Sequence, residues 1–183
     1  MPGMGLLFVL AAVTGETSAA RPIFDFSPGD EPWRNIDDTV MGGRSASEMR
    51  IEEGRGVFTG NVSLENNGGF ASVRSLPDDH DLSGSRGVVI RFRGDGKIYG
   101  FRIKTDRRYD GVSYQAEIAT VDGEWREIRL PFHEFRPVFR GRTVPGYAAL
   151  DPGSIKSFGL MISRKQDGPF RIEIDWIRAY GER

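Results

Sequence analysis

The feature that most constrains the fold is a strict alternation of apolar and polar residues in short segments. In the clearest case, Val88, Ile90 and Phe92 fall on one side, while Arg91 and Arg93 fall on the other. Successive side chains of a β-strand point to opposite faces, so this period predicts strands with one buried face. The segments that alternate in this way are 87–93, 99–104, 114–119 and 170–177.

Turn-forming residues separate these segments, and no window of 11 residues has the pattern of an amphipathic helix. Single helical turns are expected near 131–135 and after Asp151, which can cap a turn that has Pro152 at its first position. Antiparallel strands with one polar and one apolar face predict an all-β sandwich. The turn signals fall at 66–69, 77–79, 94–96, 122–123, 145–146 and 167–169.

Composition supports this fold class and excludes several functions. The chain of 183 residues fits one domain, expected over 21–183, and its 24 Gly and 12 Phe favour an all-β domain. With 25 basic and 26 acidic residues, it has no charge excess for general nucleic-acid binding. With no Cys, it has no disulfide, thiol nucleophile or Cys-bound zinc.

Residues 1–20 allow three interpretations. The apolar run Gly5–Val13 is too short to span a bilayer but suits the core of an export signal, and Ser18–Ala20 suits its cleavage site. An export signal is favoured, although no basic residue precedes Arg21. An unstructured start or a packed helix are the alternatives. The export signal predicts a periplasmic or exported protein, and the alternatives predict a cytoplasmic one. No later segment is apolar enough to cross a membrane.

Catalytic patterns are scarce, and we expect no enzyme. The two histidines, His80 and His133, are not in the spacing of a two-histidine zinc helix, and the chain has no G-x-S-x-G motif. Two acids that are adjacent on a strand point to opposite faces of the sheet, whereas the two catalytic carboxyl groups of a glycosidase must flank one glycosidic bond.

The segment Trp33–Ser47 (WRNIDDTVMGGRSAS) combines an aromatic residue, paired acids and paired glycines, which is a more specific pattern than an ordinary turn has. It offers Asp37 and Asp38, while the turn 66–70 offers Asn66 and Asn67, and we expect the two segments to meet at one end of the sandwich. One interpretation is a binding site made of acids and amides. The other, slightly favoured, is a pair of turns that specify the fold.

Loop carboxylates also suggest a structural calcium ion, because this hard cation binds acid and carbonyl oxygens. The candidate ligands are Asp37, Asp38 and Asp95, and the alternative is that they are solvated turn residues.

A second candidate binding surface is the polar face of the predicted strands. If the strands are neighbours, this face can bind a sugar or a polar peptide, or it is an ordinary solvated face. Its members would be Arg91, Arg93, Arg102, Lys104, Gln115 and Glu117.

A third candidate is the long connection near 136–142, which presents Phe139 between Arg140, Arg142 and flanking Pro and Gly. An aromatic anchor with forked donors is typical of a protein contact patch. The alternative is that the aromatic ring plugs the edge of the sandwich.

Several ordered blocks resemble the complex I intermediate-associated protein 30 family. Their agreement in order over roughly 23–181 makes the resemblance specific, although each block alone is weak. The blocks are 33–47, 58–72, 93–99, 125–142 and 168–174.

The resemblance implies a jelly-roll β-sandwich of the galactose-binding-domain-like type. It also implies a non-enzymatic protein-binding module that assists assembly of a respiratory membrane complex by contacting an immature subunit. We expect this chain to depart from the mitochondrial member by lacking its long N-terminal extension and transit peptide. The alternative function is a carbohydrate-binding module, because galactose-binding-like jelly rolls recur in sugar-binding proteins.

Overall fold

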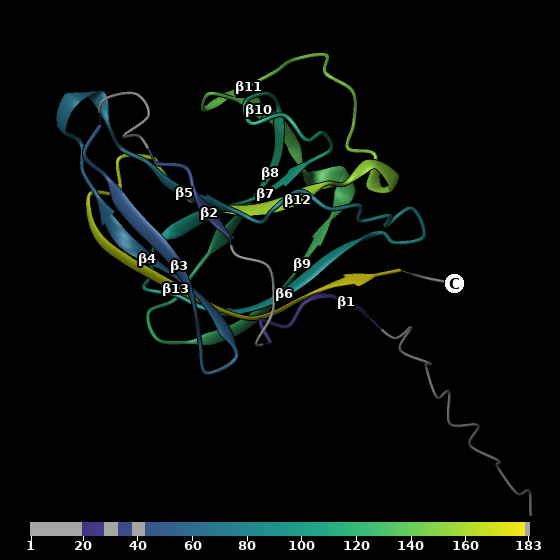
Figure 1. Ribbon diagram of the computed structural model, residues 1–183, viewed down its shortest axis with the longest axis horizontal. Helices are drawn as coiled ribbons and strands as arrows, with labels where there is room; N and C mark the ends of the chain where they lie inside the picture. Colours follow the sequence, from purple (N-terminus) through teal and green to yellow (C-terminus); the bar gives the residue numbers. More distant parts are fainter. Residues whose placement is uncertain (1–19, 28–32, 38–42, 182–183) are drawn as a thin grey trace, which may run out of the picture.

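The computed structural model describes residues 20–27, 33–37 and 43–181, which form two antiparallel sheets packed face to face (Figure 1). The six-stranded sheet has β1 (Arg21–Phe24) paired to β13 beside the strand order β3 (Ala46–Glu52), β4 (Arg55–Val62), β13 (Gly168–Tyr180), β6 (Gly87–Arg93) and β9 (Trp125–Pro131). The seven-stranded sheet has the order β11 (Arg142–Thr143), β10 (Arg136–Phe139), β8 (Ser113–Ala119), β7 (Ile98–Lys104), β12 (Ser157–Ile162), β5 (Ala71–Arg74) and β2 (Arg34–Asn35).

The core lies between the inner faces of the two sheets. Phe58 and Ile90 from one sheet and Phe101 and Phe158 from the other are fully buried. Phe24 packs edge-on against Phe158, with ring centroids 5.7 Å apart, and extends this core as an aromatic cluster. Burial of so many large apolar side chains is the main stabilising contribution. The predicted all-β jelly-roll sandwich is confirmed.

The alternating segments are confirmed as β6, β7, β8 and β13, but one predicted face is wrong. The alternation in 170–177 predicts that Trp176 shares the buried face of Ile174. A β-bulge between these two residues shifts the register, so Trp176 pairs with Arg91 and Ile177 pairs with buried Ile90. A bulge adds one residue to a strand and reverses the phase of the alternation beyond it.

Both predicted helical turns are present as 3-10 turns, η3 (Phe132–Glu134) and η4 (Pro152–Ser154). The Asp151 carboxylate caps η4 by accepting the Gly153 N–H at 3.0 Å. A further turn, η2 (Glu65–Asn67), was predicted only as a turn. Among the described residues, no helix is long and apolar enough to cross a membrane. The predicted export signal lies outside them, apart from residue 20.

Candidate functional site

The polar surface predicted from the alternating strands is two surfaces. Arg91 and Arg93 lie on β6 in the six-stranded sheet, whereas Arg102 lies on β7 in the seven-stranded sheet. Gln115 and Glu117, on β8, belong with Arg102. The assumption that all these strands are neighbours was therefore wrong, because alternation assigns a face but not a sheet.

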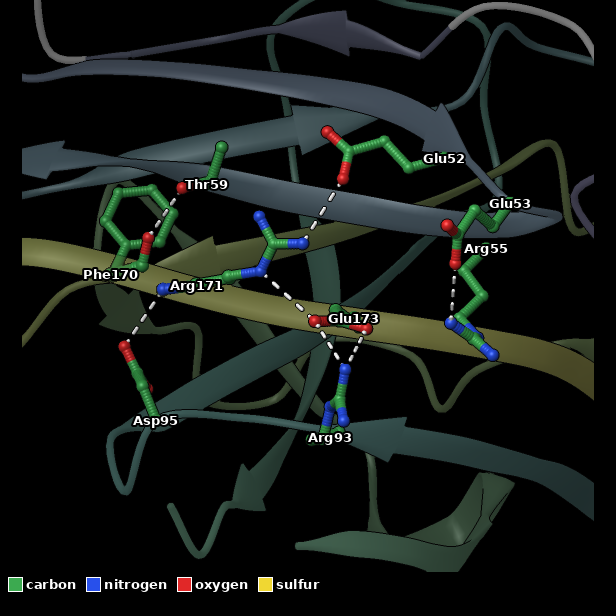
Figure 2. A network of polar contacts seen from close by, with 9 residues as sticks. All are labelled: Glu52, Glu53, Arg55, Thr59, Arg93, Asp95, Phe170, Arg171 and Glu173. Carbon is green, nitrogen blue, oxygen red and sulfur yellow. Dashed lines mark hydrogen bonds and ion pairs between the residues drawn. The ribbon is translucent and has the colours of Figure 1, made fainter. Parts of the chain in front are cut away.

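The outer face of the six-stranded sheet carries a closed network of ion pairs (Figure 2). Arg171 contacts Glu52 at 3.2 Å and Glu173 at 3.1 Å, and Arg93 contacts Glu173 at 2.8 Å. Burial of Glu173 raises its pKa, but the hydrogen bonds from Arg93 and Arg171 outweigh this effect and hold the pKa below its usual value. The network joins β3, β13 and β6, so it stabilises the pairing of these strands in the sheet.

Trp125 on β9 extends this network. The guanidinium groups of Arg55, Arg91 and Arg93 lie 5.5, 4.9 and 5.1 Å from its ring centroid. Arg91 is also ion-paired with Asp175. The cations around Trp125 are thus balanced by neighbouring acids and by the ring, which favours a structural role for this face.

The outer face of the seven-stranded sheet is different. The cross-strand register aligns one residue from each of six strands in a single row, and paired residues share a face of the sheet. We call its four arginines, Arg34, Arg74, Arg102 and Arg136, the arginine row. The full row, from β10 to β2, is Arg136, Gln115, Arg102, Gly159, Arg74 and Arg34.

In the part of the chain that the structure describes, the arginine row has no ion-pair partner. Among the described residues, none of its four members forms an ion pair. Arg102 donates from Nε to Gln115 Oε1 at 2.8 Å, and Arg74 donates from Nη1 to the Tyr109 carbonyl at 3.0 Å. These neutral acceptors orient the guanidinium groups without cancelling their charge.

Burial of Arg74 and Arg102 makes positive charge at the centre of the arginine row unfavourable. Partial burial, reinforced by the charge of Arg74, lowers the pKa of Arg102 to about 10. Burial also lowers the pKa of Arg74, although Tyr109, Asp106 and Asp110 oppose the effect. Because guanidinium stays protonated near neutral pH, the lowered values report a cost of holding two like charges there, not a loss of charge.

Two glycines, Gly100 on β7 and Gly159 on β12, lie in the central strands of this sheet. A Cβ at Gly159, between Arg74 and Arg102, would lie 2.7 Å from the Val73 carbonyl oxygen. A Cβ at Gly100 would lie 2.7 Å from Cδ of Gln115, whose side chain covers that glycine. Gly159 therefore lets β5 and β12 approach closely, and Gly100 makes room for the Gln115 side chain that lies across it.

Acids near the arginine row already have partners. Glu117 pairs with Arg164, Asp106 lies 3.2 Å from Lys104, and Asp110 lies 2.9 Å from Arg140. Lys104, which was predicted to belong to the polar surface, is buried beneath this region and is neutralised by Asp106.

The described parts of the segment Trp33–Ser47 contact residues on either side of the turn 66–70, namely Glu65 and Ser72. Asp37 is nearly buried and accepts hydrogen bonds from Ser47 N at 2.9 Å, Ser47 Oγ at 2.6 Å and Ser72 N at 3.1 Å. Arg44 bridges to Glu65 at 2.8 Å, just before Asn66, which has a φ of 53°. These contacts favour a scaffold role. Asp38 lies outside the described residues, and Asn67 ends η2.

The calcium ligands were predicted to be Asp37, Asp38 and Asp95. Asp95 accepts hydrogen bonds from Tyr99 Oη at 2.9 Å and from Arg171 N at 2.9 Å, so it fixes a hairpin turn. In the described part of the chain, no three His, Cys, Asp or Glu side chains are grouped to hold a metal. A calcium site involving Asp38 stays a prediction.

Residues 136–143 form a hairpin, not the long connection expected. Arg140 and Gly141 both have positive φ, at 48° and 76°, and close a two-residue turn between β10 and β11. Arg140 stacks on Phe139 with Cζ 5.2 Å from the ring centroid, and Phe139 pairs with Arg142 across the turn. Phe139 stays half-exposed at the sheet edge.

Sequence reasoning missed Arg34, Arg74 and Arg136. Each lies on a short strand, β2, β5 or β10, with too few residues to show a period. Only the pairing register reveals that they align with Arg102.

Comparisons with known proteins agree on one family. The sequence model described as complex I intermediate-associated protein 30 matches residues 24–174. A protein of Schizosaccharomyces pombe described as uncharacterized is 29% identical over 82% of this chain and 78% of its own length. The mitochondrial complex I intermediate-associated protein 30 of Drosophila melanogaster is 26% identical over 92% of this chain and 64% of its own length. The Mus musculus counterpart is 27% identical over 88% of this chain. The chain spans only 56% of that mouse protein.

Solved structures support the galactose-binding-like fold. A family 11 carbohydrate-binding module of a Clostridium thermocellum cellulase has a TM-score of 0.69 at 19% identity, covering 90% of this chain and 96% of the module. The family 11 module in complex with a mixed-linked tetrasaccharide gives a TM-score of 0.67 at 20% identity, covering 88% of this chain and 95% of the module. At this identity the likeness concerns the fold alone.

Proposed function

Since the chain belongs to the complex I intermediate-associated protein 30 family, we propose that it is a non-enzymatic protein-binding module that assists assembly of a respiratory membrane complex. Its partner would be a subunit of a complex I-type enzyme before that subunit reaches its final place. The relatives from fly and mouse are described as complex I intermediate-associated protein 30, mitochondrial. The compartment of this chain stays a prediction.

The observation that carries the proposal beyond family membership is the difference between the two outer faces. On the outer face of the six-stranded sheet the arginines are paired with acids of the same sheet, whereas the arginine row has no acidic partner among the described residues. Half-buried cations without counter-ions raise the energy of the free protein, and a partner that supplies acids lowers it. The seven-stranded sheet is therefore the proposed contact face.

Affinity purification from detergent-solubilised membranes of the native host tests the assembly role. The tagged chain should enrich subunits of a complex I-type enzyme over a mock purification from the untagged strain. Recovery of no respiratory subunit above the mock level would remove the proposed role.

Carbohydrate binding is a second candidate, favoured by one observation. The Arg102–Gln115 pair and the exposed ring of Tyr109, whose backbone carbonyl accepts a hydrogen bond from Arg74, occur on the same side of the seven-stranded sheet. Such groups suit a hydroxyl-rich ligand, and a neighbour of the same fold is described in complex with a tetrasaccharide. On a glycan array, specific binding that Arg102→Ala and Gln115→Ala both abolish would favour this candidate. An array without signal would reject it.

A further inference from the structure

We propose that the arginine row is a docking site for an extended acidic segment of a partner protein, with Arg74 and Arg102 binding two of its carboxylates. This inference rests on the proposed protein-binding function and names the chemistry of the partner.

Charge complementarity identifies the occupant. Three acids near the row, Asp106, Asp110 and Glu117, are held by Lys104, Arg140 and Arg164. Glu134 lines one pocket with Gln115 and Arg136. Four arginines remain on one face with only neutral acceptors at the two central ones. A carboxylate is the group that balances a guanidinium best, because the two planar groups form paired charge-assisted hydrogen bonds.

Geometry places the centre of the site at Arg74 and Arg102. Both side chains are half-buried and held at one end by a hydrogen bond, so little side-chain entropy is lost when a ligand binds. Their charges repel each other, and this repulsion contributes to the lowered pKa of Arg102. A bound carboxylate would relieve both the repulsion and the cost of burial.

Size sets the length of the occupant. Strands of a sheet lie about 4.8 Å apart, so the five spacings from Arg136 to Arg34 cover about 24 Å. An extended chain advances about 3.4 Å per residue, which corresponds to roughly seven residues. Arg74 and Arg102 are two spacings apart, about 10 Å at the backbone, so they would bind acids two or three positions apart. Exposed Tyr109, beside Arg74, offers a ring at the rim of the site.

Fluorescence anisotropy with a model peptide tests the site. The probe is a fluorescein-labelled eight-residue peptide that alternates glutamate with serine, and the control peptide has glutamine in place of glutamate. The full chain should bind the acidic peptide and not its control. Arg74→Gln and Arg102→Gln should each weaken binding about fivefold or more, the scale of a charge-assisted hydrogen-bond pair.

A matched variant separates this site from general electrostatics. Arg50→Gln removes the same charge from the opposite sheet, where Arg50 is exposed and paired with Glu48 at 2.7 Å. It should change the affinity less than twofold, because Arg50 is exposed to solvent and its charge is already paired with Glu48. Circular dichroism of each variant would confirm that the sandwich is retained.

Three results would overturn the inference: no binding of the acidic peptide, equal binding of the glutamine peptide, or an equal loss in Arg50→Gln. Loss of glycan binding in Arg102→Gln without any peptide binding would also overturn it.

The inference and the proposed function fail separately. If respiratory subunits co-purify but the peptide does not bind, only the acidic docking site is rejected. If the peptide binds but no such subunit co-purifies, only the assembly role is rejected.

Discussion

Single residues reveal which polar groups hold the fold and which are left for a partner. Asp37 belongs to the first kind, because one carboxylate accepts three hydrogen bonds that join its segment to β3 and β5. Removing it leaves the donors of half-buried Ser47 and of buried Ser72 without this acceptor. Asp37→Ala should lower the free energy of unfolding by about 2 kcal/mol, measured by urea denaturation.

The matched control is Asp122→Ala, because Asp122 is an exposed turn residue. It should change the stability by less than about 0.5 kcal/mol. Unchanged stability in Asp37→Ala together with lost partner binding would instead make this segment a binding site.

His80 is the residue expected to make stability depend on pH. Its ring packs between Phe24 and Phe158, at centroid distances of 6.0 and 5.1 Å, and burial lowers its pKa below the usual 6.5 despite the opposing charge of Asp78. The unfolded chain therefore binds a proton more readily, so folding stability falls as pH drops through about 6.5. The melting temperature should drop less between pH 7 and 5 in His80→Gln than in the wild type.

Exposed His133 provides the control for this pH effect. His133→Gln should follow the wild-type pH profile of the melting temperature. A His80→Gln profile that coincides with the wild type would show that His80 does not contribute.

At the level of elements, glycine controls how closely the central strands of the seven-stranded sheet approach. A Cβ at Gly159 on β12 would meet the Val73 carbonyl of β5 at 2.7 Å, and a backbone atom cannot move aside cheaply. Gly159→Ala should lower the free energy of unfolding by about 1–3 kcal/mol. Gly84→Ala is the control, because nothing lies within 4 Å of a Cβ there. Equal stability of the two variants in thermal melts would contradict the close packing.

Elements also differ in how far the sequence predicted them. Long alternating strands such as β6 and β7 show their period over seven residues, so their buried faces were predictable. The bulge before Trp176 was not, because local alternation carries no record of an inserted residue. The hairpin at Arg140 was missed because arginine is not a residue that signals a turn with positive φ.

At the level of the whole molecule, the sequence predicted the architecture better than the site. Burial of one face per strand leads to a sandwich, which composition and turn signals already favour. The arginine row depends on which strands pair and in what register, and these are long-range properties. Arg102 and Gln115 were predicted to belong to one polar surface, and the structure pairs them across β7 and β8. Arg91 and Arg93 were grouped with them wrongly, because their strand belongs to the other sheet.

The central claim is that the protein supports assembly of a respiratory complex through the arginine row. Complementation of a deletion strain tests it most directly, with assembled NADH-oxidising complex measured by in-gel activity on native gels. We predict that the wild-type chain and Arg50→Gln restore the assembled complex. The double variant Arg74→Gln/Arg102→Gln, although folded and present at the wild-type level, should leave it at the level of the deletion. Full assembly in the deletion strain, or full rescue by the double variant, would contradict the claim.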